Sequence, residues 1–227
     1  INKTDRAIQN LMNLYFTGSE EKALTEAIGL SILNPNSAEI LNIIASATFK
    51  LGRKTSCLRF YNRALQIQPN LVEAHNNIGF VSSSLNNFTS ACDSFKRAII
   101  LNPNYPEAFN NYGRALSIIG QQENAVCCFK MSLYIYPNFF DALINLGTGL
   151  TEIGREEEAI LCFQKLLESR HKDSRIHHNF GIALYKVGKY KEAEKQFIFS
   201  KLNKSKYYLL RCQFLRGDHK LFQKTLD

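Results

Sequence analysis

The sequence has 227 residues, of which 45% are hydrophobic and 21% are charged, so a chain that is disordered throughout is not expected. Only 5 prolines and 12 glycines occur, which excludes collagen-like and linker-like polymers. The 28 Lys and Arg exceed the 20 Asp and Glu by 8, and this basic excess favours acidic partners without selecting peptide, lipid or nucleic acid.

Proline and glycine recur along the chain with a single period of 34 residues. The prolines of this series are Pro35, Pro69, Pro103 and Pro137. One glycine column contains Gly79, Gly113, Gly147 and Gly181. A second contains Gly18, Gly52, Gly120, Gly154 and Gly188, with Asn86 filling its one vacant place. Nine of the 12 glycines therefore follow the period, which indicates a protein built of internal repeats.

Within each period, the apolar spacing predicts two helices. In residues 106–139, Phe109, Tyr112 and Leu116 share one face of a first helix, and a second apolar series begins after Gly120. A glycine between two helices supplies the left-handed backbone that ends the first of them. Pro137 ends the second helix, because proline lacks a donor and disfavours helix in the preceding residue.

This pattern predicts six helix hairpins followed by a short, atypical one. The predicted units are residues 4–37, 38–71, 72–105, 106–139, 140–173 and 174–207, with a basic cap over 208–227. His171 and Ser205 replace the closing proline of the last two units, and Lys206–Arg216 and His219–Leu226 are the expected helices of the seventh hairpin. Residues 201–227 hold seven Lys or Arg and two Asp or Glu. They are interpreted either as a solvated cap or as a docking surface.

Small and aromatic residues repeat with the same period and are interpreted as packing residues. Gly79, Gly147 and Gly181 lie in mid-helix, where glycine costs about 1 kcal/mol relative to alanine unless two helices must approach closely. The aromatic column, expected to fill the space between units, is Tyr61, Phe95, Phe129, Phe163 and Phe197. The six cysteines form no CxxC pair and are expected to be reduced, small apolar residues of an intracellular protein.

The segment HNNIGFVSSSLNNFTSACDSFKRAIILNPN, from His75 to Asn104, resembles the tetratricopeptide repeat closely. The resemblance covers residues 4–207, and it departs most in the first unit, where Leu11 and Ala27 occupy the glycine and aromatic places. It implies an all-α fold, a right-handed α-solenoid of stacked hairpins. It also implies that an extended peptide binds along the concave groove, mainly to residues of the first helices.

One column of asparagines is expected to face that groove: Asn77, Asn111, Asn145 and Asn179. Asn42, Asn76 and Asn110 form a shorter column beside it, and Arg114, Thr148, Thr151 and Tyr185 complete the expected peptide-binding surface. A primary amide both donates and accepts, so such a column can hold a peptide main chain of any sequence. The column resembles the asparagine ladder in the repeat region of O-GlcNAc transferases. The alternative is that these amides only join neighbouring hairpins.

No catalytic constellation, metal site or cofactor motif is predicted. His177 is expected to be a packing residue, and His178 continues the groove column at the place where chaperone-tail binders carry a lysine. Nucleic acid is not expected as a partner, because the basic residues are diffuse and belong to no known module.

The predicted function is a non-catalytic, cytoplasmic scaffold that binds a protein or peptide partner, and the basic excess favours an acidic one. No apolar run reaches the roughly 18 to 20 residues of a membrane span. The alternative is the substrate-recruiting repeat region of a larger enzyme, such as a glycosyltransferase, a sulfotransferase or a 2-oxoglutarate-dependent oxygenase.

Overall fold

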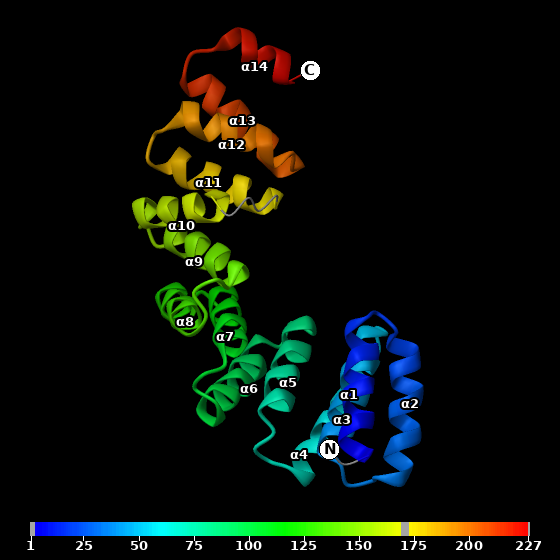
Figure 1. Cartoon of the computed structure of the whole chain (residues 1–227). Coiled ribbons are helices and arrows are strands. Elements are labelled where there is room, and N and C mark those ends of the chain that lie inside the picture. Colours follow the sequence, from blue (N-terminus) through cyan, green and yellow to red (C-terminus); the bar gives the residue numbers. More distant parts are fainter. Residues whose placement is uncertain (1–2, 169–172, 227) are drawn as a thin grey trace. The chain divides into compact units, whose positions relative to one another are not determined.

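The computed structural model describes residues 3–168 and 173–226, and throughout these residues the only regular structure is α-helix (Figure 1). The helices are α1 Lys3–Phe16, α2 Glu20–Leu33, α3 Ala38–Lys50, α4 Lys54–Ile67, α5 Val72–Ser84, α6 Phe88–Leu101, α7 Pro106–Ile118, α8 Gln122–Ile135, α9 Phe140–Glu152, α10 Glu156–Glu168, α11 Ser174–Lys186, α12 Tyr190–Ser200, α13 Asn203–Leu215 and α14 His219–Leu226. The all-α prediction is confirmed. His171, expected to close the fifth hairpin, lies outside the described residues.

The chain forms two compact units, Ile1–Ala115 and Leu116–Asp227. In the first unit, α1–α2, α3–α4 and α5–α6 are antiparallel pairs, and each pair packs against the next through α2 on α3 and α4 on α5. In the second unit, α9–α10, α11–α12 and α13–α14 repeat this arrangement. First helices also contact first helices, as α3 does α5 and α9 does α11, so neighbouring hairpins complete one another's core.

The turn between the helices of a hairpin has a left-handed residue where the sequence predicted one. Gly52, Gly120, Gly154 and Gly188 have φ between +77° and +83°. Asn86, which fills the vacant place in this glycine column, has φ +61°. Asparagine is one of the few residues with a side chain that adopts this backbone readily. The second glycine column is therefore a turn column, as predicted.

The mid-helix glycines allow a phenylalanine ring to lie directly against helix backbone. A Cβ built on Gly79 would lie 2.6 Å from Cε1 of Phe95, and one built on Gly181 would lie 2.5 Å from Cε1 of Phe197. Each pair joins the two helices of one hairpin, so the aromatic column fills the hairpin itself as well as the space between units. The ring of Phe163 in α10 also lies 6.0 Å from that of Phe180 in α11, the next hairpin.

Both histidines of α11 bond to neighbouring helices. His178 is 4% exposed, and its Nδ1 lies 2.8 Å from Oγ of Ser205 in α13. His177 is half-buried and bonds to Gln196 through Nδ1 at 2.8 Å. The prediction of a groove-facing His178 is wrong, because α13 packs over the end of the array and covers that side of α11.

The cysteines divide into buried and accessible thiols. Cys57, Cys92 and Cys212 are buried, as expected of small apolar residues, and burial raises the pKa of each thiol. Half-buried Cys162 has its pKa raised to about 11, first by desolvation and then by Glu158. Cys127 is exposed, unlike the prediction for the group.

The last hairpin is attached to α12 by a short connection and a buried polar contact. Lys201 adopts a left-handed conformation with φ +51°, and α13 then begins at Asn203, three residues before the predicted start. Glu194 of α12 is 5% exposed, and Arg216 and Gln213 both donate to its carboxylate. α14 has the predicted bounds. None of the helices in the described ranges is long and apolar enough to cross a bilayer.

Candidate functional site

The predicted asparagine column makes hydrogen bonds between successive first helices. In the first unit, Nδ2 of Asn77 lies 3.4 Å from both Oδ1 of Asn42 and Oγ of Ser46. Nδ2 of Asn111 donates to Oδ1 of Asn76 at 3.2 Å. These contacts join α5 to α3 and α7 to α5, so each amide nitrogen points toward the preceding hairpin.

The second unit repeats this geometry with a threonine as acceptor. Nδ2 of Asn179 in α11 donates to Oγ1 of Thr148 in α9 at 2.9 Å. In the described part of the chain, the Oδ1 atoms of Asn111 and Asn179 accept no hydrogen bond, and neither is among the buried unpaired oxygens. Their carbonyl oxygens therefore reach solvent, where they can accept a hydrogen bond from a ligand.

The shorter column is more deeply placed than its neighbour. Asn76 is 7% exposed and Asn110 is 5% exposed, whereas Asn42 is half-buried. Because the Oδ1 of Asn76 accepts a hydrogen bond from Asn111, Asn76 is a hydrogen-bonded amide of the core. Of this column, Asn42 is the member that reaches a surface cavity.

A cavity of about 280 Å³ opens on the first helices of the first unit. Its lining residues come from α1, α3, α5 and the segment before α7: Met12, Tyr15, Phe16, Asn42, Ile43, Ser46, Glu73, Asn77 and Tyr105. The lining combines the amides and hydroxyls of Asn42, Ser46 and Asn77 with exposed apolar side chains, Met12 and Phe16. This combination of an apolar wall with a few convergent polar groups is the usual composition of a ligand site.

The tyrosines of this cavity remain protonated donors. Burial, with the carboxylates of Glu107 and Glu73, raises the pKa of Tyr105 to about 12. Burial and Glu20 also raise the pKa of Tyr15. Lys50 places its Nζ 3.9 Å from the centroid of the Tyr15 ring and donates to the Tyr15 carbonyl at 3.0 Å, which fixes the end of α1 against α3.

The second unit has a smaller cavity, of about 110 Å³, on the equivalent helices. It is lined by Thr148, Thr151, Glu152, Asn179, Ile182 and Lys186. Lys186 donates to the carbonyl of Thr151 and lies 3.6 Å from Oε1 of Glu156, so its ammonium is held at the rim. Both predicted threonines line this cavity together with Asn179.

The remaining predicted residues have different surroundings. Arg114 is exposed, and Asn111 and Asn145 are half-buried. Tyr185 packs against α12 and α13, with its ring 5.5 Å from that of Tyr190 and 5.8 Å from that of Tyr208. Sequence reasoning missed this packing, because it depends on where α13 lies.

Several residues of the larger cavity were also missed. Met12, Phe16 and Tyr105 belong to none of the columns described above, so the repeat gave no reason to select them. Glu73 belongs to a 34-residue column of acids, Glu39, Glu73, Glu107 and Asp141, that was not selected. The sequence signal was the departure of the first unit from the repeat pattern, which leaves apolar side chains at the end of α1 exposed.

Sequence profiles of the tetratricopeptide repeat match residues 38–71 and 72–105, and a further one matches residues 94–126. These segments are tetratricopeptide repeats. The first two ranges coincide with the second and third predicted units, and the third runs from α6 into α8. No curated protein matches the sequence.

Solved structures with the tetratricopeptide fold are similar to the chain. A crystal structure of the Cut9–Hcn1 hetero-tetramer of the APC/C has a TM-score of 0.78 at 14% identity, covering 91% of this chain and 42% of that one. PilF of Pseudomonas aeruginosa has a TM-score of 0.71 at 17% identity, covering 83% and 88%. YrrB, described as a tetratricopeptide protein with an unusual peptide-binding site, has a TM-score of 0.69 at 18% identity, covering 82% and 97%. At these identities the similarity shows the fold alone.

Proposed function

We propose that the chain is a non-catalytic scaffold that holds an extended peptide along its first helices. The cavity of the first unit anchors one peptide side chain. The observation that carries the proposal is the composition of this cavity, where Asn42 and Asn77 lie beside exposed Met12 and Phe16. An apolar anchor supplies binding energy through burial, at about 25 cal/mol per Å² of apolar surface.

The column amides contribute through their oxygens. Because the nitrogens of Asn111 and Asn179 point to the preceding hairpin, the exposed oxygens accept hydrogen bonds from peptide N–H groups. The similarity of the column to the ladder of O-GlcNAc transferases, and the peptide-binding site named for YrrB, support this role. A cytoplasmic site of action is part of the proposal and rests on the unpaired cysteines. Recruitment of substrates to a catalytic domain elsewhere in a longer protein would use the same face.

A random peptide library displayed on phage tests the proposal. Peptides selected on the wild-type protein are measured by fluorescence anisotropy against Phe16→Ala, which removes an apolar wall of the cavity. Leu33→Ala is the matched control, because Leu33 is similarly exposed but belongs to α2 and does not line the cavity. We expect Phe16→Ala to raise Kd by about tenfold or more, equivalent to about 1.4 kcal/mol, and Leu33→Ala to leave it unchanged.

The main-chain contacts have a test of their own. A selected peptide is resynthesised with single N-methyl groups, each of which removes one backbone donor. We expect N-methylation beside the anchoring side chain to weaken binding. Selected peptides that bind Phe16→Ala as tightly as wild type, or that tolerate every N-methyl group, would exclude this mode of binding.

A further inference from the structure

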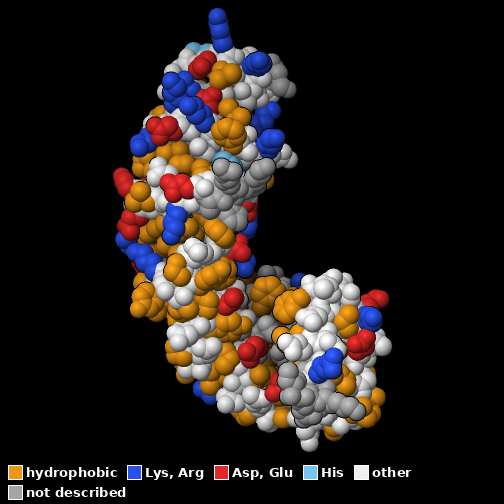
Figure 2. Space-filling model, in the orientation of Figure 1, with side chains coloured by type: hydrophobic (Ala, Val, Ile, Leu, Met, Phe, Trp, Pro, Cys, Tyr) orange, Lys and Arg blue, Asp and Glu red, His pale blue; other side chains and the backbone are white. Residues whose placement is uncertain are grey.

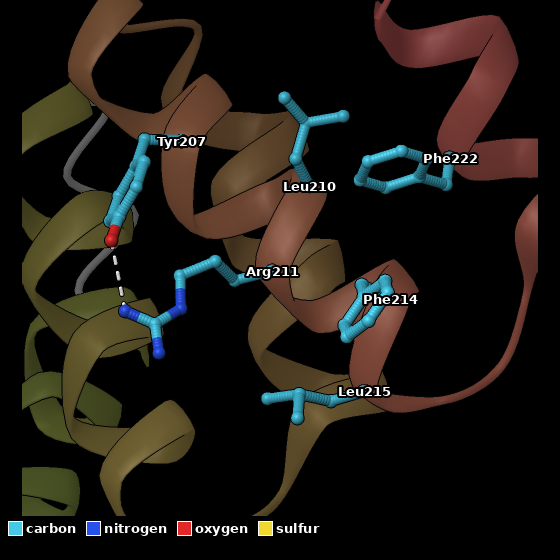
Figure 3. A pocket seen from close by; sticks show the side chains of 6 residues that line it. All are labelled: Tyr207, Leu210, Arg211, Phe214, Leu215 and Phe222. Carbon is cyan, nitrogen blue, oxygen red and sulfur yellow. Dashed lines mark hydrogen bonds between the residues drawn. The ribbon is translucent and has the colours of Figure 1, made fainter.

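The last hairpin has an exposed aromatic and aliphatic face. A cavity of about 440 Å³ lies between α13 and α14, lined by Tyr207, Leu210, Arg211, Phe214, Leu215 and Phe222 (Figure 3). Tyr207 and Phe214 are 58% and 59% exposed. A solvated cap would carry polar side chains here, and a contiguous exposed apolar surface marks an interaction site instead.

Arg211 is the one charged residue of this lining. Its Nη1 donates to the Tyr207 hydroxyl at 2.9 Å, and its guanidinium lies 5.6 Å from the ring centroids of both Tyr185 and Tyr207. Figure 3 shows the Arg211 side chain projecting away from α13 with its guanidinium beside the Tyr207 hydroxyl. Among the described residues, no carboxylate forms an ion pair with Arg211, whereas Arg216 on the same helix is paired with Glu194. The aromatic rings therefore orient the Arg211 cation without neutralising it.

Most charged residues in the segment that forms the cavity are positive, like Arg211. Residues 201–227 contain seven Lys or Arg and two Asp or Glu, and Figure 2 shows blue side chains over the α12–α14 end of the second unit. Of the two acids, Asp218 is used locally, because its Oδ1 accepts from the Leu221 amide at the start of α14. A partner for this face must therefore be acidic as well as apolar.

We infer that the α13–α14 face binds a short acidic segment of another protein, with an apolar side chain in the cavity and a neighbouring carboxylate on Arg211. Arginine suits this role, because its planar fork pairs with a carboxylate through two hydrogen bonds. A second copy of the chain would bring the same positive charge to the interface. Phosphate backbones and anionic membranes require several cations in the contact, and this cavity offers one among apolar side chains. The inference is independent of the cavity on α1, α3 and α5.

A display selection with random peptides tests this inference on the full chain. Selections are run on wild type, on Arg211→Gln and on Lys220→Gln, and the enriched sequences are compared. Lys220→Gln removes the same charge from an exposed α14 residue that does not line the cavity, which makes it the matched control. We expect wild type and Lys220→Gln to enrich peptides with Asp or Glu beside Leu or Phe, and Arg211→Gln to lose them. For a synthesised peptide of this class, we expect Kd to rise about tenfold or more with Arg211→Gln.

Three results would overturn the inference. The first is that wild type enriches no acidic and apolar class of peptide. The second is that Arg211→Gln and Lys220→Gln weaken the selected peptide equally, which would indicate general charge attraction. The third is displacement of the peptide by polyuridylate RNA or by phosphatidylserine vesicles at comparable concentrations, which would assign the face to nucleic acid or membrane. Retained binding to Phe16→Ala separates these peptides from those of the first-unit cavity.

Discussion

Phe95 of α6 lies against Gly79 of α5 so closely that a Cβ on Gly79 would be 2.6 Å from the ring. The ring is buried, so it has no free space into which to move. Alanine at this position gains about 1 kcal/mol of helix propensity but adds a methyl group to a filled core, which costs about 1–3 kcal/mol.

We therefore expect Gly79→Ala to lower the free energy of unfolding by up to about 2 kcal/mol, measured by urea denaturation. Gly29→Ala is the control, because Gly29 lies within α2 with nothing within 4 Å of its added Cβ. This substitution should stabilise the protein by roughly 0.5–1 kcal/mol. Equal effects of the two substitutions would contradict the packing role of Gly79.

The hydrogen bond from Asn111 to Asn76 should stabilise the fold more than the one from Asn179 to Thr148. Asn111→Ala leaves the buried Oδ1 of Asn76 without its donor, so we expect a loss of about 1–3 kcal/mol. Asn179→Ala should cost only about 0.5–1.5 kcal/mol, because the Thr148 hydroxyl still donates to the Ile144 carbonyl at 2.9 Å. Thermal unfolding followed by circular dichroism measures both. The reverse order would mean that the Asn76 oxygen finds another donor.

The buried imidazole of His178 should make stability depend on pH. Burial first, and then the charge of Lys204, lower its pKa from 6.5 to about 4 in the folded protein. The groups that face the ring are Ser205, Phe197 and Tyr208, which offer no carboxylate. As the pH falls, the unfolded chain binds the proton before the folded protein does. The contribution of neutral His178 to the free energy of unfolding is therefore complete above pH 6.5 and is lost as the pH falls toward about 4.

His178→Phe removes the titrating group and keeps an aromatic ring in the same packing. We expect the midpoint temperature of this variant to fall less than that of wild type between pH 6.5 and 4. If His178→Phe keeps the full slope, the pH dependence arises elsewhere in the chain.

The contact of Arg216 with Glu194 should be important for holding α13 on α12. In Arg216→Ala, the Glu194 carboxylate, which is 5% exposed, loses its cation. Gln213 is then its remaining donor. Because Arg216 itself is partly exposed, we expect a loss of about 2–3 kcal/mol, below the 3–5 kcal/mol of a fully buried pair. Adding Glu194→Gln removes the unpaired charge and should recover part of the loss in a thermal melt. No recovery would indicate that Arg216 acts through packing alone.

The repeat made most of the fold predictable. The turn glycines and Asn86 predicted where the first helices end, because a turn at that point needs a left-handed residue. All of these residues have positive φ. The close approach at Gly79 was predictable because glycine recurs in mid-helix with the 34-residue period, at Gly79, Gly147 and Gly181, despite its cost in a helix. The start of α13 was not, because Lys201 rather than glycine adopts the left-handed conformation there.

The candidate site was less predictable, because it depends on contacts between hairpins. The period identified Asn77 and Asn179 but left open whether their amides bind a peptide or join neighbouring hairpins, and in the structure their nitrogens bond to the first helix of the preceding hairpin. The burial of His178 depends on α13, whose position lies outside the periodic part of the chain. The cavity of the first unit depends on Phe16 and Tyr105, which belong to no column.

The distribution of thiols gives the protein its own reporters of local opening. Cys57, Cys92, Cys162 and Cys212 lie in α4, α6, α10 and α13, one in each of four hairpins, and burial holds each of their pKa values above the usual range. The thiolate is the nucleophile that attacks an alkylating reagent, so these four sites react faster when their hairpin opens, and exposed Cys127 reacts first. Pulsed alkylation read by mass spectrometry would therefore rank the hairpins by the free energy of opening, without any labelled residue being introduced.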